Sequence, residues 1–209
     1  MSLIDNDNLP KIVRTLARSD SALAIVVSRH GPPPLWSRPP GFATLLHIIL
    51  EQQVSLASAK ACFDKLEAQL HLVTPERLLT LNDAELRAVG FSRQKAGYAR
   101  HLSEAVLSQR ICLDPLQHLA DADVKTELTK LKGVGEWTSD IYMLMALRRP
   151  DVMPRGDIAL QTAWHRLSGE SRPTADEFLR IAERWRPYRS VAARLLWHYY
   201  LSNSQKHDR

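Results

Sequence analysis

The sequence predicts an all-α protein, and three observations lead to this fold class. Apolar residues recur at helical spacing in nearly every segment of the chain. Helix start signals, such as Thr74-Pro75 and Asn82-Asp83, punctuate those segments. No run of alternating β-branched residues, which would be typical of a strand, occurs in the sequence. Strands are therefore expected to be few or absent.

The helices can be placed in order along the chain. The first is expected from about Asn8 to Val27, and a proline-rich connection from Gly31 to Gly41 follows, since proline cannot occupy a helix interior. Further helices are expected at residues 42–51, on to about 70, after Thr74, after Asn82 as far as Gly90, and at 92–108, 121–131, 135–147, 157–167, 174–185 and 190–201. The polar residues 203–209 are expected to form a frayed tail.

Composition and charge narrow the function classes without selecting one. The 209 residues carry a net charge of +5, which is compatible with a polyanionic partner. No apolar run reaches the roughly 20 residues needed to cross a bilayer, and the first residues lack the features of a secretory signal. Two cysteines, Cys62 and Cys112, are too few for an iron–sulfur cluster or a four-cysteine zinc site. A protein that stays in a reducing compartment is expected.

The most informative local segment is the stretch Leu131-Lys132-Gly133-Val134-Gly135-Glu136-Trp137-Thr138 between two predicted helices. Its glycines let the chain reverse tightly and expose backbone N–H groups at the amino end of the next helix, where the dipole favours an anion. A DNA phosphate suits such a site, and Lys132 adds a charged contact. Gly-Val-Gly alone is more typical of a plain helix hinge, but the longer string favours DNA binding. The basic residues that flank it in sequence are Lys125, Lys130, Arg148, Arg149 and Arg155.

A candidate carboxylate, Asp157, follows the hairpin in the segment Met153-Pro154-Arg155-Gly156-Asp157. Aspartate at a helix start is commonly an N-cap, whose side chain accepts a hydrogen bond from the first turn. The capping role and a functional role are compatible, because a carboxylate at a helix start can still point into a cleft.

The hairpin followed by a Pro-x-Gly-Asp segment resembles the helix-hairpin-helix glycosylases, which excise damaged bases from DNA. Within them the chain is most similar to the DNA-3-methyladenine glycosylase II group. Three further stretches carry the resemblance: Ile48-Ile49-Leu50-Glu51-Gln52-Gln53-Val54-Ser55, Gly90-Phe91-Ser92-Arg93-Gln94-Lys95-Ala96, and Glu183-Arg184-Trp185-Arg186-Pro187-Tyr188-Arg189-Ser190 with Trp197. The similarity covers roughly Gly41 to Leu201, and ordered motifs over such a span are far harder to obtain by accident than one.

The resemblance implies a single glycosylase unit over residues 1–209, with two helical lobes and the active site in the cleft between them. It places Asp157 at the catalytic aspartate. It places Gln53 where a side chain plugs the gap left in the duplex by the extruded base. The positions of the base pocket are Gln52, Trp137 and Trp197.

The resemblance also gives the hairpin two roles. Its DNA phosphate site corresponds to Lys132, Gly133, Val134 and Gly135. The family can bind a monovalent cation, Na⁺ or K⁺, through hairpin carbonyls, which here are those of Thr129, Leu131 and Val134. No other cofactor is expected.

The chemistry explains why one carboxylate is sufficient. An alkylated purine such as 3-methyladenine is positively charged and leaves readily, so a single aspartate can stabilise the oxocarbenium-like sugar and orient or deprotonate water. Trp137 and Trp197 can stack on the extruded cationic base. Glycosylases that also cleave the backbone usually carry a lysine two residues after the second hairpin glycine, where this chain has Trp137. Base removal without strand cleavage is therefore expected.

Some positions depart from the family pattern and leave the substrate range open. Gly156 stands where some relatives have an acid, and Ile141 where an aromatic residue can line the pocket. The additional amino-terminal sheet domain of the bacterial prototype is not expected within these 209 residues. The remaining tryptophans, which are expected in the core, are Trp36, Trp164 and Trp185.

Three alternatives stay open. The chain could be a non-catalytic helix-hairpin-helix DNA-binding module, or a glycosylase for deaminated or oxidised bases. A helical protein-interaction domain is the third, and it would leave Asp157 and the hairpin glycines without linked roles. The expected partner is double-stranded DNA containing damaged bases, bound by a monomer with no membrane association. The expected location is the bacterial cytoplasm, associated with the nucleoid, or the nucleus of a eukaryote.

Overall fold

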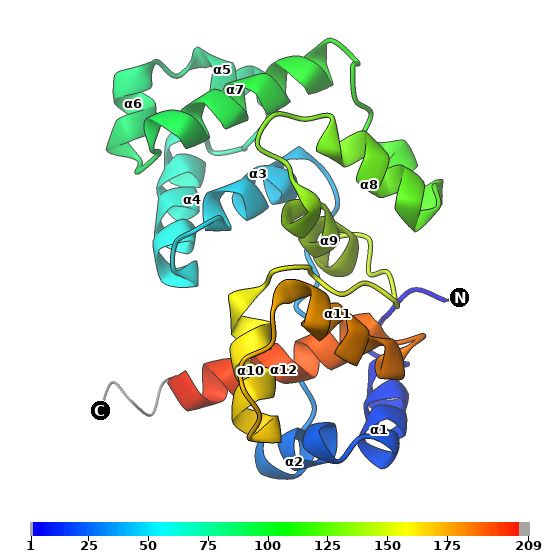
Figure 1. The fold of residues 1–209 in the computed structure, drawn as a ribbon. Coiled ribbons are helices and arrows are strands. Elements are labelled where there is room, and N and C mark those ends of the chain that lie inside the picture. The colour runs from blue at the N-terminus through cyan, green and yellow to red at the C-terminus, as the bar shows by residue number, and fades with distance from the viewer. Residues whose placement is uncertain (1, 205–209) are drawn as a thin grey trace. The chain divides into compact units, whose positions relative to one another are not determined.

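The structure, a computed structural model, describes residues 2–204, and over this range it is entirely helical apart from turns and loops (Figure 1). Residues 2–204 form twelve α-helices and two 3₁₀ helices and contain no β-strand. The predicted all-α fold class is confirmed. The chain divides into two compact helical units: unit 1 comprises residues 1–37 and 148–209, and unit 2 comprises residues 38–147.

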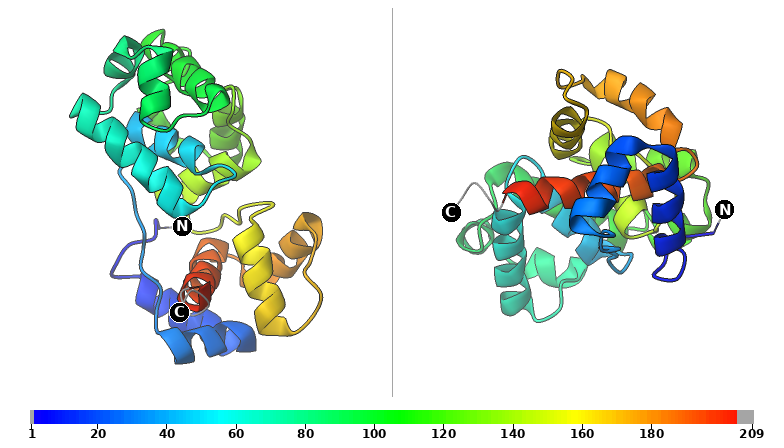
Figure 2. Two further views of the ribbon diagram at one scale, coloured as in Figure 1. Left: turned by 90° about the vertical axis from the view of Figure 1, so that its left-hand side faces the viewer. Right: turned by 90° about the horizontal axis from the view of Figure 1, so that it is seen from below.

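Unit 1 is assembled around its last helix. Its elements are α1 (Leu9–Ser19), α2 (Ser21–His30), α10 (Ile158–Ser168), α11 (Ala175–Ala182), the 3₁₀ helix η2 (Glu183–Trp185) and α12 (Arg189–Ser204). Helix α12 contacts α1, α2, α10 and η2, and its crossing with α10 can be followed in Figures 1 and 2. Residues from both ends of the sequence therefore share one core.

The centre of that core is aromatic. Trp185 is fully buried, and its ring meets those of Trp164 and Phe178 edge to face, with centroids 5.5 and 6.2 Å away. Edge-to-face contacts of this kind add to the stabilisation from burial alone. The indole Nε1 of Trp185 donates to the Asp20 carboxylate over 2.8 Å, so its polar atom is satisfied although the ring is inaccessible.

The prediction of one long first helix is wrong, because the chain breaks at Asp20. The expected single helix from Asn8 to Val27 is in fact two helices, α1 and α2, separated at Asp20. Asp20 has extended backbone angles, and its Oδ1 accepts a hydrogen bond from Leu23 N as the N-cap of α2. Apolar spacing continued across the break, so periodicity could not reveal it.

Unit 2 surrounds a helix that is apolar on nearly every side. Helix α3 (Phe42–Glu51) has buried side chains at eight of its ten positions and contacts α4, α7 and α9, as expected for a central helix. The other elements of this unit are α4 (Leu56–Leu70), α5 (Pro75–Thr80), α6 (Asp83–Ala88), α7 (Arg93–Leu107), the 3₁₀ helix η1 (Asp114–His118), α8 (Asp121–Thr129) and α9 (Glu136–Met145). The predicted start signals at Thr74 and Asn82 are N-caps, and Asn82 forms a complete capping box with Glu85.

Two further predictions need correction. Trp36 is only partly buried rather than in the core, because it lies in the proline-rich segment with a positive φ of 49° and meets His198 edge to face. The expected tail is wrong for residue 203, since Asn203 belongs to α12 and its Nδ2 donates to Tyr199 O over 2.7 Å. Residues 205–209 of that predicted tail lie outside the described range.

Over residues 2–204, no helix combines the length and the apolar character required to cross a membrane.

Candidate functional site

The predicted hairpin joins α8 to α9 in unit 2, and its shape depends on Gly133. This glycine has a φ of +87°, a conformation that side chains disfavour. A Cβ added there would lie 2.3 Å from atoms of the Tyr98 ring on α7, so there is also no space for one. Val134 turns its side chain inward, where it is 5% exposed, and its N–H donates to Leu131 O over 3.0 Å. The turn is held by both steric fit and hydrogen bonding.

The outer side of the hairpin leaves donors accessible. Lys132 and Gly135 are exposed, and Gly135 is the N-cap residue of α9. Among the described residues, no acceptor pairs with the backbone N–H of Gly133 or Gly135. Of the four predicted phosphate-binding positions, only Val134 has its N–H engaged inside the turn. The arrangement suits an anion at the amino end of a helix.

Gln52, predicted in the base pocket, contacts the hairpin. Its Nε2 donates to the Gly133 carbonyl and to the Thr138 hydroxyl, each over 2.8 Å. The Gln52 amide thereby joins the carboxyl end of α3 to both sides of the turn. Its Oε1, which accepts no hydrogen bond from the described residues, is the atom left for contact with a base.

Gln53, the predicted duplex plug, lies in the exposed turn that follows α3. It has a φ of 57°, and its neighbours Val54 and Leu56 are 46% and 56% exposed. Lys95 holds the preceding turn, because its Nζ donates to Leu50 O over 2.6 Å. Burial lowers the pKa of Lys95, although the adjacent Cys62 opposes that change. The stretch of residues 48–55 and the stretch of residues 90–96, which are separate in the sequence, therefore meet at the carboxyl end of α3.

The two hairpin helices are braced by an ion pair that sequence reasoning missed. Lys125 on α8 approaches the buried Asp140 on α9 at 2.9 Å. A buried carboxylate requires such a partner, since leaving it unpaired in the interior is costly. Three of the basic residues that flank the hairpin in sequence form ion pairs within the protein: Lys125 with Asp140, Lys130 with Glu127, and Arg155 with Asp176.

The candidate carboxylate in unit 1, Asp157, is 8% exposed. It caps α10, and its Oδ1 accepts a hydrogen bond from Leu160 N over 3.0 Å. The same oxygen accepts from the indole Nε1 of Trp197 over 3.3 Å. The capping role therefore coexists with a contact to Trp197 that the sequence did not predict, and N–H donors hold the carboxylate from two directions.

The two predicted pocket tryptophans differ in their surroundings. Trp197 is 9% exposed and presents its N–H edge to Asp157. Trp137 is partly buried in the first turn of α9. The structure thus brings Asp157 and Trp197 together in unit 1, and Gln52 and the hairpin together in unit 2. Ile141 is buried in α9.

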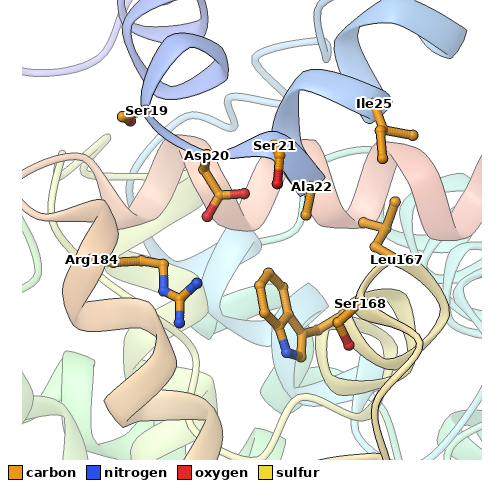
Figure 3. A pocket seen from close by; sticks show the side chains of 9 residues that line it. Ser19, Asp20, Ser21, Ala22, Ile25, Leu167, Ser168 and Arg184 are labelled. Atoms are coloured by element: carbon orange, nitrogen blue, oxygen red, sulfur yellow. The ribbon is translucent and has the colours of Figure 1, made fainter.

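A separate polar pocket of about 310 Å³ opens on unit 1 (Figure 3). Arg184 lies over the Trp164 ring at 5.4 Å from its centroid, and Asp20 and Ser168 also line the hollow. Neither Asp157 nor Trp197 is among its lining residues. We therefore do not assign it to the base. No group of three or more His, Cys, Asp or Glu side chains that could hold a metal occurs over residues 2–204.

A helical protein with a glycine hairpin ready for an anion and a restrained carboxylate at a later helix start falls in the helix-hairpin-helix class. The family model of the HhH-GPD superfamily base excision DNA repair proteins matches residues 46–187. The chain belongs to that superfamily.

Individual relatives extend over most of the chain. It is 27% identical to the Bacillus subtilis DNA-3-methyladenine glycosylase over 207 residues, 93% of this chain and 68% of the relative. It spans 66% of the length of another Bacillus subtilis relative. The Schizosaccharomyces pombe 3-methyladenine DNA glycosylase Mag1, solved with abasic DNA, superposes with a TM-score of 0.81 at 25% identity, covering 90% of this chain and 95% of that one. A DNA-3-methyladenine glycosidase from Bacillus halodurans superposes with a TM-score of 0.75 at 31% identity, covering 99% and 95%.

Proposed function

We propose that this protein is a monofunctional DNA glycosylase of base excision repair that hydrolyses the N-glycosidic bond of alkylated purines such as 3-methyladenine and leaves an abasic site. The observation that carries the proposal is the buried Asp157 carboxylate, restrained by Leu160 N and by the Trp197 indole. Relatives named as 3-methyladenine glycosylases support the substrate class.

The proposed reaction needs one negative charge beside the sugar. As the bond to a cationic base breaks, positive charge develops on the sugar, and the Asp157 carboxylate stabilises it. The restrained carboxylate needs little reorganisation at that moment, and it can orient or deprotonate the attacking water. The base is already a good leaving group, so no strong general acid is required.

The proposed partner is double-stranded DNA containing damaged bases, bound by a monomer. The accessible N–H groups of Gly133 and Gly135 together with Lys132 take the phosphates, which fixes position without reading sequence. Gln53 enters the stack, and Trp137 and Trp197 contact the extruded base with Gln52 Oε1. DNA as the partner implies a location with the chromosome, in the bacterial cytoplasm or the eukaryotic nucleus.

The hairpin carbonyls are the proposed ligands of a monovalent cation. Those of Thr129, Leu131 and Val134 are neutral oxygen donors at the negative end of the α8 dipole. Leu131 O accepts one hydrogen bond from Val134 N and keeps a second lone pair. Bound Na⁺ or K⁺ would supply positive charge next to the phosphate site. No cofactor takes part in the proposed chemistry.

Strand cleavage is not part of the proposed activity. A lyase needs an amine to form a Schiff base with the sugar. Trp137 occupies the position where the bifunctional enzymes usually carry that lysine.

The test is incubation with methylated duplex DNA, followed by measurement of released bases and of strand breaks before and after alkali. The wild-type protein should release 3-methyladenine and give breaks only after alkali. Asp157→Asn should still bind duplex DNA but lose excision, whereas Asp7→Asn, on an exposed carboxylate of the same unit, should excise normally.

Each alternative gives a different result. On duplexes that carry the corresponding lesions, release of hypoxanthine, uracil or 8-oxoguanine in preference to N3-alkylpurines would identify a glycosylase for deaminated or oxidised bases. Tight DNA binding without release of any base would identify a non-catalytic module, and breaks without alkali would identify a lyase.

A further inference from the structure

The carboxy-terminal motif around Arg189 and Ser190 has no role in the chemistry above, yet it contacts the loop that leads to Asp157. This loop, residues 150–156, runs from the start of the second segment of unit 1 to the N-cap of α10. We propose that Arg189 and Ser190 are positioning residues that fix this loop and thereby the Asp157 carboxylate. The proposal rests on the proposed catalytic role of Asp157.

Ser190 binds the loop through its backbone and its hydroxyl. It is 0% exposed, and its N–H donates to Pro150 O over 3.0 Å. Its Oγ accepts from Val152 N over 2.9 Å and donates to Val152 O over 3.1 Å. One buried hydroxyl thus satisfies both backbone groups of a loop residue, which would otherwise be buried without partners.

Arg189 fixes Asp151, the loop residue between Pro150 and Val152. Its Nε and Nη2 donate to the two carboxylate oxygens of Asp151 over 2.8 and 3.0 Å. Nη2 also donates to the backbone oxygen of Asp151 over 3.0 Å. Both side chains are largely shielded, at 15% and 18% exposure. The paired geometry restricts orientation more than a single contact would. Nη1 binds Glu183 over 2.9 Å, which ties the arginine to η2 as well.

One helix therefore holds the loop at both ends. The first two residues of α12 fix residues 150–152, and Trp197, two turns further along α12, donates to Asp157 Oδ1. Between these contacts, Arg155 pairs with Asp176 of α11 at 2.8 Å. A shift of the loop at its start would move Asp157 relative to the indole that binds it, and small displacements of a reacting group cost large factors in rate.

The main test is the variant Ser190→Ala compared with Ser103→Ala. Ser103 is also 0% exposed, but its Oγ donates to Ala99 O within α7 of unit 2, so it controls for loss of a buried hydroxyl. Single-turnover excision from methylated duplex should fall about tenfold or more in Ser190→Ala. The Kd for duplex with an abasic site should stay within about twofold in both variants, and Ser103→Ala should keep the wild-type rate.

Arg189→Met and Arg189→Lys provide a second test that leaves the buried hydroxyl in place, should Ser190→Ala not fold. Arg189→Met should slow excision without weakening DNA binding. Arg189→Lys, which keeps the charge but loses the paired contact, should fall between Arg189→Met and wild type. Exchange of the backbone amide protons of residues 151–153 and 155–157 should be faster in Arg189→Met than in wild type.

The outcomes separate this inference from the proposed function. Wild-type excision rates in folded Ser190→Ala and Arg189→Met would overturn the positioning role, as would an equal rate loss in Ser103→Ala. If Asp157→Asn excises normally, the proposed function is wrong in its choice of carboxylate. Faster exchange of the loop in Arg189→Met would still show in that case that Arg189 holds the loop.

Discussion

The two units restrain their functional groups by different physical means. In unit 2 the turn of the hairpin is held by neutral contacts, namely the Tyr98 ring against Gly133 and the Gln52 amide at Gly133 O and Thr138, while the Lys125–Asp140 ion pair joins the helices on either side of it. In unit 1 the Asp157 carboxylate is held by N–H donors. The hairpin presents backbone N–H groups, whose direction depends on the conformation of the turn. Unit 1 presents the Asp157 carboxylate, whose position depends on individual hydrogen bonds. Damage to unit 2 should therefore appear in DNA affinity, and damage to unit 1 in turnover.

The largest effect on affinity is expected from Gly133→Ala. Alanine is strained at a φ of +87°, and its Cβ would overlap the Tyr98 ring at 2.3 Å. Distortion costing about 2–3 kcal/mol corresponds to roughly 30- to 150-fold weaker DNA binding. The measurement is a Kd for abasic duplex by fluorescence anisotropy, with excision at saturating protein as the comparison.

The double variant Tyr98→Ala with Gly133→Ala sharpens this prediction. Removing the ring relieves the overlap but not the backbone strain, so part of the affinity should return. Full recovery would show that the steric contact alone matters. A turnover defect at saturating protein, with unchanged Kd, would contradict the division of labour between the units.

A smaller effect, in unit 1, is expected from Trp197→Phe. Phenylalanine keeps an aromatic face for the base but lacks the N–H that donates to Asp157 Oδ1 over 3.3 Å. Loss of a hydrogen bond to a charged group costs about 1.5 kcal/mol, which corresponds to roughly tenfold in kcat. Single-turnover rates and Kd for abasic duplex are the measurements. A change confined to Kd would show that the indole contributes to DNA binding and not to the position of Asp157.

The sequence predicted the fold class because helical spacing and capping residues act locally. The start signals at Thr74 and Asn82 needed only their own neighbours to form caps. The break at Asp20 was missed because apolar spacing continues across it, and the bond from Trp185, a residue 165 positions away, to its second carboxylate oxygen has no local signature. Trp36 was wrongly placed in the core because aromatic character alone does not show how far a side chain in the proline-rich segment is buried.

The site was predictable only where a motif carries its own chemistry. The Gly-Val-Gly turn and Asp157 could be found from the sequence, but the Lys125–Asp140 ion pair joins two helices and has no local signature. Gln52 shows the limit of a resemblance, since a pocket position gave no indication that its Nε2 holds Gly133 O. Contacts between motifs become visible only when the chain is folded.

A modest effect in unit 2 is expected from Lys132→Ala. Lys132 is exposed and carries no structural contact that the fold depends on. Loss of one phosphate contact should weaken binding a few-fold and reduce the slope of log K against log salt by about 1. Titrations at several salt concentrations measure both, with Lys60→Ala, at an exposed i,i+4 pair with Asp64, as the control. An unchanged slope would place the phosphate away from this side chain.

The smallest effect concerns α3, the helix that ends just before Gln52 and Gln53. His47 stacks on Phe63 with ring centroids 4.3 Å apart, and burial lowers its pKa although the nearby Glu51 opposes that change. The unfolded chain therefore takes up the proton first as pH falls below about 6.5, so the free energy of unfolding should decrease there. Urea unfolding at several pH values should show this decrease, weakened in His47→Gln and retained in His118→Gln, on an exposed imidazole of the same unit. An identical pH dependence in His47→Gln and wild type would mean that other groups set the acid response of unit 2.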